Sequence, residues 1–150
     1  MYRSAKLLFC SVVCALALVG CEGLTHQSNS PKIVMPDQTL TDIVWSADEK
    51  AKDFAIRPLF RDEHLSAVVM RMSANEPPHF HDRHDLAVTV IDGPVAINFR
   101  DRREVFQRGD VVLIPKGTYH WAETLGGKPG VVFVTFSPAF DGKDRRLATP

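Results

Sequence analysis

From Leu40 onward, short apolar runs alternate with clusters of turn-forming residues along the chain. Apolar runs of about four to eight residues between Gly, Pro, Asp or Ser clusters are typical of β-strands. The predicted strands lie at residues 43–46, 55–60, 65–73, 87–91, 95–100, 104–107, 111–114, 121–123 and 131–137. Only residues 48–53 predict a helical turn. Many short strands at close spacing favour an all-β sandwich or barrel.

The turns and the most apolar runs refine this picture. Asp92-Gly93 between two apolar runs predicts a β-hairpin, and residues 126–130 predict a further turn. The runs 111–114 and 131–134 contain no polar residue, so we expect both of their faces to be buried. A homodimer is one way to supply the outer layer that such strands need, and flanking segments of the same chain are the other.

The first residues have the order of an export signal. Arg3 and Lys6 precede an apolar stretch at residues 7–19, which is too short to span a bilayer. The stretch ends in Leu18-Val19-Gly20-Cys21, which resembles a bacterial lipobox. This resemblance implies that residues 1–20 are a lipoprotein signal peptide and that Cys21 is lipidated. An ordinary signal peptide that is cleaved elsewhere is the alternative.

Lipidation at Cys21 would anchor the chain to a membrane through its N-terminus, on the periplasmic side of the bacterial envelope. Glu22 follows the cysteine where an aspartate would favour the inner membrane, so the resemblance favours the outer membrane. The polar residues 21–39 predict a tether, and residues 40–150 predict a single domain.

Cysteine count and net charge exclude two further classes of protein. Removal of residues 1–20 takes away Cys10 and Cys14 and leaves only Cys21, so no disulfide is expected. The chain carries 18 basic and 18 acidic residues, and its formal charge is zero. Without a basic patch, nucleic acid is not an expected partner.

Histidines form the candidate chemistry of the domain. His79 and His81 are two residues apart, and this spacing points both imidazoles to one face of a β-strand. His120 follows a turn rich in Gly and Pro, in which Gly117 permits a positive φ that reverses the chain. Imidazoles that converge on one face are suited to bind a transition metal.

These two segments resemble the two sequence motifs of the cupin family. The first motif, G-x5-H-x-H-x(3,4)-E-x6-G, is matched by His79, His81 and Gly93, with Ser73 at the opening glycine. The second, G-x5-P-x-G-x2-H-x3-N, is matched by Gly109, Pro115, Gly117 and His120, with Thr124 at the final asparagine. The resemblance implies an all-β double-stranded β-helix, a jelly-roll barrel that holds a metal inside.

The sequence departs from the family at the glutamate of the first motif. Counting back from Gly93 places Leu86 there, and leucine cannot bind a metal. Asp85 would serve if the strand carries a one-residue bulge, and His84 is the next candidate. We therefore predict a metal site of His79, His81 and His120, with Asp85 ahead of His84 as the fourth ligand. A water or a substrate oxygen is the alternative occupant of that position.

The predicted protein is a lipid-anchored periplasmic cupin that binds a divalent metal (Fe, Mn, Ni, Cu or Zn) and a small-molecule ligand. As an enzyme, of a dioxygenase- or isomerase-like kind, it would use the metal as a Lewis acid or oxygen activator. Asp85, His84 and Tyr119 are the nearby titratable residues, and the sequence assigns no catalytic base among them. The alternative is a non-catalytic ligand-binding or structural envelope protein with a degenerate site.

Overall fold

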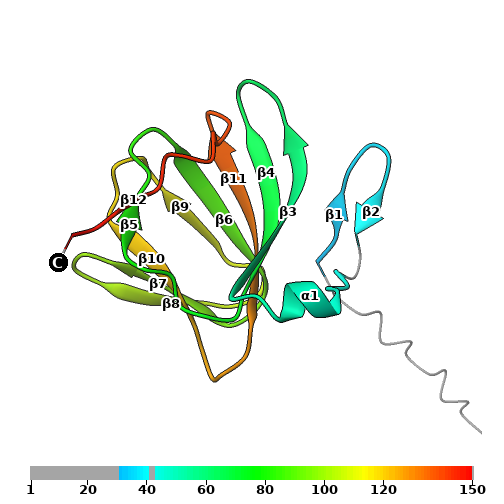
Figure 1. Cartoon of the computed structure of the whole chain (residues 1–150), viewed down its shortest axis with the longest axis horizontal. Coiled ribbons are helices and arrows are strands. Elements are labelled where there is room, and N and C mark those ends of the chain that lie inside the picture. The colour runs from blue at the N-terminus through cyan, green and yellow to red at the C-terminus, as the bar shows by residue number, and fades with distance from the viewer. Residues whose placement is uncertain (1–30, 41–42, 150) are drawn as a thin grey trace, which may run out of the picture.

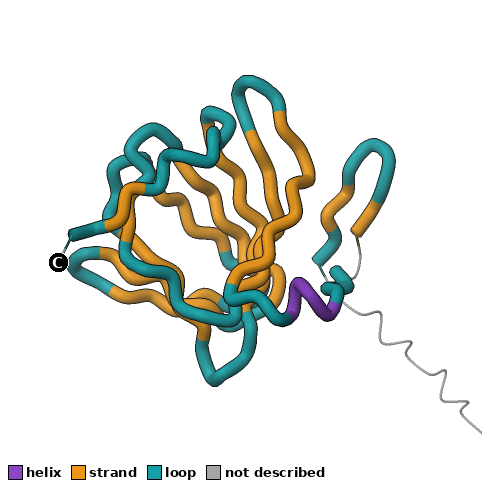
Figure 2. Tube along the Cα trace, in the orientation of Figure 1, coloured by secondary structure: helices purple, strands orange, loops and turns teal. Residues whose placement is uncertain are grey.

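Two five-stranded sheets face each other across a common core (Figures 1 and 2). The computed structural model describes residues 31–40 and 43–149. The first sheet, in spatial order, contains β3 (Phe54–Arg61), β4 (Ser66–Met72), β11 (Gly130–Ser137), β6 (Asp85–Asp92) and β9 (Val111–Ile114). The second contains β12 (Arg146–Leu147), β5 (His79–Phe80), β10 (His120–Thr124), β7 (Val95–Phe99) and β8 (Arg103–Phe106). A separate hairpin of β1 (Ile33–Val34) and β2 (Thr39–Leu40) and the short helix α1 (Ala47–Lys50) precede them.

This architecture confirms the predicted all-β jelly-roll barrel. Alternation along β6 turns Leu86, Val88 and Val90 inward, where they are buried. Val95 and Ile97 of β7 belong to the same core cluster from the opposite sheet. Each fully buried apolar side chain of this size contributes about 1.5–3 kcal/mol of transfer free energy. The core therefore also forms the apolar wall of the barrel interior.

The outer face of the first sheet is covered in part by the segment that precedes β3. Trp45 packs with Ala55, Val69 and Val131 in a second core cluster. The Arg57 guanidinium lies 4.6 Å from the centre of the Trp45 ring. Of the two expected sources of an outer layer, a flanking segment of the same chain is the one that covers β11.

The outer face of β9 differs from the expectation. Val111 and Leu113 are 55% and 70% exposed in the single chain. The prediction that both faces of this strand are buried is therefore wrong for the monomer. β9 lies at the edge of its sheet, beyond the segment that carries Trp45. A homodimer that covers this edge stays a prediction.

Two local predictions were wrong for identifiable reasons. Residues 43–46 form no strand, because Ser46 is the N-cap of α1 and exchanges capping-box hydrogen bonds with Glu49. The Asp92-Gly93 pair makes no hairpin, since β6 and β7 belong to different sheets. A Cβ at Gly93 would lie 2.9 Å from Val90 Cγ1, so only glycine fits the corner between the sheets. The other predicted strands closely match observed ones, and helix α1 overlaps the predicted helical turn at 48–53.

The N-terminal predictions fall mainly outside the described residues. The signal peptide, Cys21 and residues 21–30 of the tether are not described. In the remainder of the predicted tether, Ile33 and Val34 pair with Leu40 and Thr39. Across the described ranges, no helix is long and apolar enough to cross a membrane.

Candidate metal centre

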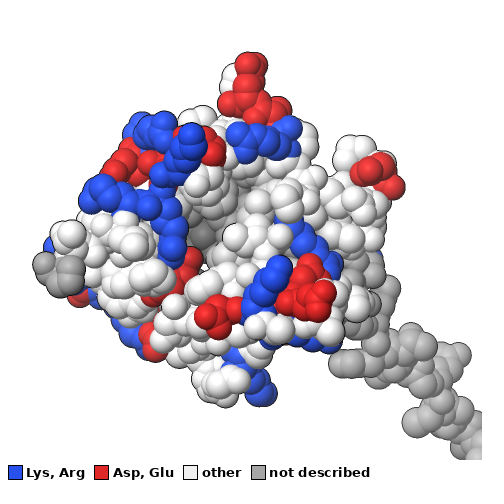
Figure 3. All heavy atoms as spheres, viewed as in Figure 1, with Lys and Arg blue, Asp and Glu red and all other residues white. Residues whose placement is uncertain are grey.

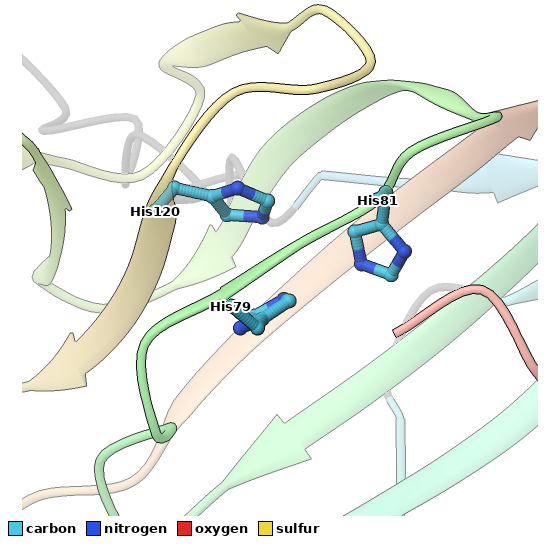
Figure 4. A group of neighbouring side chains, drawn as sticks. All are labelled: His79, His81 and His120. Carbon is cyan, nitrogen blue, oxygen red and sulfur yellow. The ribbon is translucent and has the colours of Figure 1, made fainter. Parts of the chain in front are cut away.

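The structure brings three of the predicted ligands together at the inner face of the second sheet. His79 on β5 and His120 on β10 are direct partners in the antiparallel register, and His81 lies two residues beyond His79. Figure 4 shows the three rings turned toward one another. One ring nitrogen from each histidine lies within 4.8 Å of the others. This arrangement is compact enough for one metal ion to contact all three.

Each of the three imidazoles is oriented by a backbone carbonyl. The hydrogen bonds join His79 Nδ1 to Pro77 O at 3.0 Å, His120 Nδ1 to Thr118 O at 2.9 Å and His81 Nδ1 to Asp144 O at 2.5 Å. A carbonyl oxygen can only accept, so every Nδ1 carries the proton and every Nε2 presents a free lone pair. Hydrogen bonding of the second ring nitrogen is the usual arrangement of metal-ligating histidines.

Burial keeps the three imidazoles in the neutral form that a metal requires. Burial lowers the pKa of His79 to about 3 and that of His81 to about 4, against the opposing effect of the carbonyl hydrogen bonds. Burial likewise lowers the pKa of His120. Metal binding at neutral pH would therefore displace no proton from these rings.

The histidines line a cavity of about 290 Å³ inside the barrel. Apolar side chains from both sheets form most of its wall, and Glu76 and Arg145 are the charged residues that line it. On the face drawn in Figure 3 the surface is hollowed, and Lys and Arg side chains border one side of the hollow. A mainly apolar wall strengthens electrostatic interactions inside the cavity.

The structure does not bring Asp85, the first candidate for a fourth ligand, to the imidazoles. Its side chain is on the exposed side of β6, where Oδ1 accepts the backbone N–H of Lys116 at 2.8 Å. Leu86 points inward instead and lines the cavity. Since neighbouring residues of a strand face opposite sides, an inward Leu86 places Asp85 outside. The bulge that Asp85 would need does not occur at this end of β6.

His84, the second candidate, is buried but belongs to a different network. Its Nδ1 bonds to Asp144 Oδ2 at 2.5 Å, and its Nε2 lies 3.3 Å from Ala139 O. The ring packs edge-on against Phe136 and Phe140. Both ring nitrogens are engaged, and His84 is not in the group of three described histidines that could hold a metal.

Tyr119 lies outside the cavity, although it precedes His120 in the chain. Its ring contacts Phe80 and Trp121, and the Arg100 guanidinium lies 4.9 Å from its centre. Tyr119 does not line the cavity that contains the histidines. Of the three titratable neighbours named from the sequence, none lies among the imidazoles.

Sequence reasoning missed Asp144, which supports the site from the C-terminal strap (residues 138–147). The Asp144 carboxylate accepts hydrogen bonds from the backbone N–H groups of Asp82 and Arg83 and from His84, while its own carbonyl accepts His81 Nδ1. Burial raises the pKa of Asp144, but the hydrogen bonds from His84 and the backbone outweigh this and lower it to about 2. No motif signals this residue, because its partners lie about sixty positions earlier in the chain.

Comparison with known proteins agrees with the fold. A family model described as "Cupin" matches residues 58–149. An uncharacterized protein of Aquifex aeolicus is 27% identical over 115 residues, which cover 77% of this chain and 92% of that protein. Among solved structures, KdgF from a Halomonas species superposes with a TM-score of 0.56 at 27% identity, covering 60% of this chain and 84% of that one. An RmlC-like cupin from Shewanella frigidimarina gives a TM-score of 0.55 at 25% identity, with 60% and 80% covered.

Proposed function

Because this chain belongs to the cupin family, we propose that it binds one divalent transition metal through His79, His81 and His120, and a small molecule beside the metal. The observation that carries the proposal is the shared orientation of the three rings. All three hold Nδ1 against a backbone carbonyl, which leaves Nε2 as the ligand atom, and one ring nitrogen of each lies within 4.8 Å of the others. A histidine that is merely buried in a core needs no such convergence.

The donor set indicates which metals fit. Three imidazoles without a carboxylate favour Zn, Cu, Ni or Fe over Mn, which prefers oxygen ligands. Three protein ligands also leave a coordination position open for a ligand oxygen. When bound, the metal would act there as a Lewis acid that polarises this oxygen. Leu86 and the other apolar wall residues would exclude water and contact the body of the small molecule.

Metal content tests this proposal directly. The full-length chain, purified in detergent, stripped with a chelator and reconstituted with Zn(II), is expected to retain about one zinc per chain after desalting. Elemental analysis gives the ratio. A ratio far below one, for zinc and also for Cu(II), Ni(II) and Fe(II), would contradict the metal site.

A non-catalytic ligand-binding role is the second candidate, and the cavity wall favours it. Among the described residues that line the cavity, Glu76 is the only carboxylate. Its Oε2 accepts the N–H of Ala122 at 3.0 Å and its Oε1 lies 3.8 Å from Arg145, so the group is fixed by its neighbours. Recovery of one small molecule, unchanged, from the purified metal-loaded protein would favour binding over turnover.

We also propose that Cys21 anchors the protein to the outer membrane on its periplasmic side, with residues 21–39 as the tether. The order of basic start, apolar stretch and Leu18-Val19-Gly20-Cys21 supports this. More than one acyl chain gives stable attachment, whereas a single chain gives only marginal binding.

A labelled fatty acid tests the anchor. Cells fed alkyne-palmitate are expected to label the parent protein, and a Cys21→Ala variant is expected to lose the label completely because the acceptor thiol is gone. Cys14→Ala is the matched control, since that residue lies within the predicted signal peptide. Equal labelling of Cys21→Ala and the parent would contradict lipidation at this cysteine.

A further inference from the structure

Arg145 is the only arginine or lysine among the described residues that lines the histidine cavity. It lies on the C-terminal strap, directly after Asp144, whose carbonyl orients His81. Its Nη2 is 3.8 Å from Glu76 Oε1, which is beyond hydrogen-bond distance. Within the part of the chain that the structure describes, the Arg145 guanidinium donates no hydrogen bond, whereas most of the other arginines there do.

Arg146, the next residue of the strap, makes the side-chain hydrogen bonds that Arg145 lacks among the described residues. Arg146 donates to both carboxylate oxygens of Asp82, at 2.6 and 2.8 Å. Its guanidinium also lies 4.2 Å from the centre of the Phe80 ring. Arg146 does not line the histidine cavity. The two neighbouring arginines therefore have different surroundings, and only Arg145 has donors available to a molecule in the cavity.

Glu76 links Arg145 to the metal centre through a long ion pair of 3.8 Å. The Glu76 carboxylate accepts the N–H of Ala122, two residues beyond His120 on β10. The guanidinium therefore lies close to the strand that carries one of the imidazoles. A planar guanidinium matches a carboxylate with two parallel N–H···O bonds. The Glu76 carboxyl group occupies one side of the guanidinium and leaves the remaining donors for one carboxylate of a ligand.

We propose that the cavity takes a small monocarboxylate with an apolar body, whose carboxylate pairs with Arg145 while the body lies against the apolar wall. This inference rests on the proposed function, because it assigns the ligand class of the same cavity. A cavity of about 290 Å³ lies at the lower end of the ~300–1,000 Å³ range of ligand pockets, so it fits a small ligand. The ligand is therefore a single-ring or short-chain acid.

Benzoate and benzamide test the proposal, because they share shape and size and differ in charge. Their dissociation constants are measured by NMR titration on the full-length chain in detergent, both metal-free and loaded with Zn(II). Benzoate is expected to bind at least about tenfold more tightly than benzamide, since a charge-assisted hydrogen bond contributes about 1.5–3 kcal/mol. Arg145→Gln is expected to remove the preference in the metal-free chain, Arg145→Lys to keep part of it, and Arg146→Gln to leave it unchanged.

The titrations of the metal-free chain test the role of Arg145 independently of the proposed metal site. Absence of a benzoate preference in the parent, or a preference that survives Arg145→Gln in the metal-free chain, would overturn the assignment of Arg145. Failure to retain zinc, together with an intact and Arg145-dependent preference, would overturn the metal site and leave the carboxylate site standing. Benzamide binding that is unchanged in Arg145→Gln shows that this variant is folded, and a partial preference in Arg145→Lys ties the effect to the positive charge.

Discussion

Replacement of His79 by alanine is expected to lower the zinc affinity of the protein by at least about a hundredfold. Loss of an outer hydrogen-bond partner of a ligand typically costs about 10–100-fold, and loss of the ligand itself removes one of only three donors. His120→Ala is expected to have the same effect, because His120 is the register partner of His79. The measurement is competition for Zn(II) against a chromophoric chelator, with the full-length chain.

His64→Ala is the matched control for this expectation. The His64 side chain is 81% exposed, its ring pairs with Glu63 and it does not line the cavity, so its removal should leave zinc affinity unchanged. Zinc should also raise the melting temperature of the parent and of His64→Ala, because a ligand that binds only the folded state stabilises it. The same zinc concentration should not stabilise His79→Ala. Parent-like zinc affinity in both His79→Ala and His120→Ala would show that the three imidazoles do not form the site.

The fold was predictable because its signals are local. Strand periodicity located most of the barrel, and the glycines of the second motif have the backbone geometry that the motif requires: φ is +90° at Gly109 and +76° at Gly117. The Gly117 N–H donates to His81 O at 2.7 Å, so the turn of the second motif is tied to the first. The two-residue strands β5 and β12 were not predicted, since two residues carry no periodicity.

The candidate site was predictable in part. The i,i+2 spacing placed His79 and His81 on one face, but the choice of Asp85 needed a bulge that the pairing of β6 rules out. Leu86 pairs without a register shift with Ile114 of β9 and Phe136 of β11. The inward alternation of Leu86, Val88 and Val90 already indicated that Asp85 faces outward.

The contribution of the C-terminal strap to the site could not be predicted from local sequence patterns. Asp144 and Arg145 follow no motif, and their side chains acquire a role only because the strap crosses from β11 to β12, beside β5 (Figure 1). A contact across about sixty residues leaves no mark in hydrophobic periodicity. The strap nevertheless supplies both the carbonyl that orients His81 and the arginine that lines the cavity.

Replacement of Asp144 by alanine should therefore affect both stability and metal binding. The Asp144 side chain is only 6% exposed, and its carboxylate accepts the backbone N–H groups of Asp82 and Arg83 and the Nδ1 of His84. Removal of one partner of a buried ion pair typically costs about 3–5 kcal/mol, and a buried donor left without a partner costs about 1–3 kcal/mol. We expect a loss of about 3 kcal/mol in the free energy of unfolding. The loss should not be larger, because Arg83 is partly exposed and water can replace its lost partner. Urea denaturation of the metal-free chain measures it.

Zinc affinity should fall together with stability in Asp144→Ala, by about tenfold, because the loosened strap holds its carbonyl less firmly against His81. Asp144→Asn keeps an acceptor oxygen and should lie between the parent and Asp144→Ala in both measurements. Asp82→Asn is the control: that carboxylate is 42% exposed and pairs with Arg146, so stability and zinc affinity should stay close to those of the parent. A destabilised Asp144→Ala variant that binds zinc as tightly as the parent would show that the strap supports the barrel but does not orient His81.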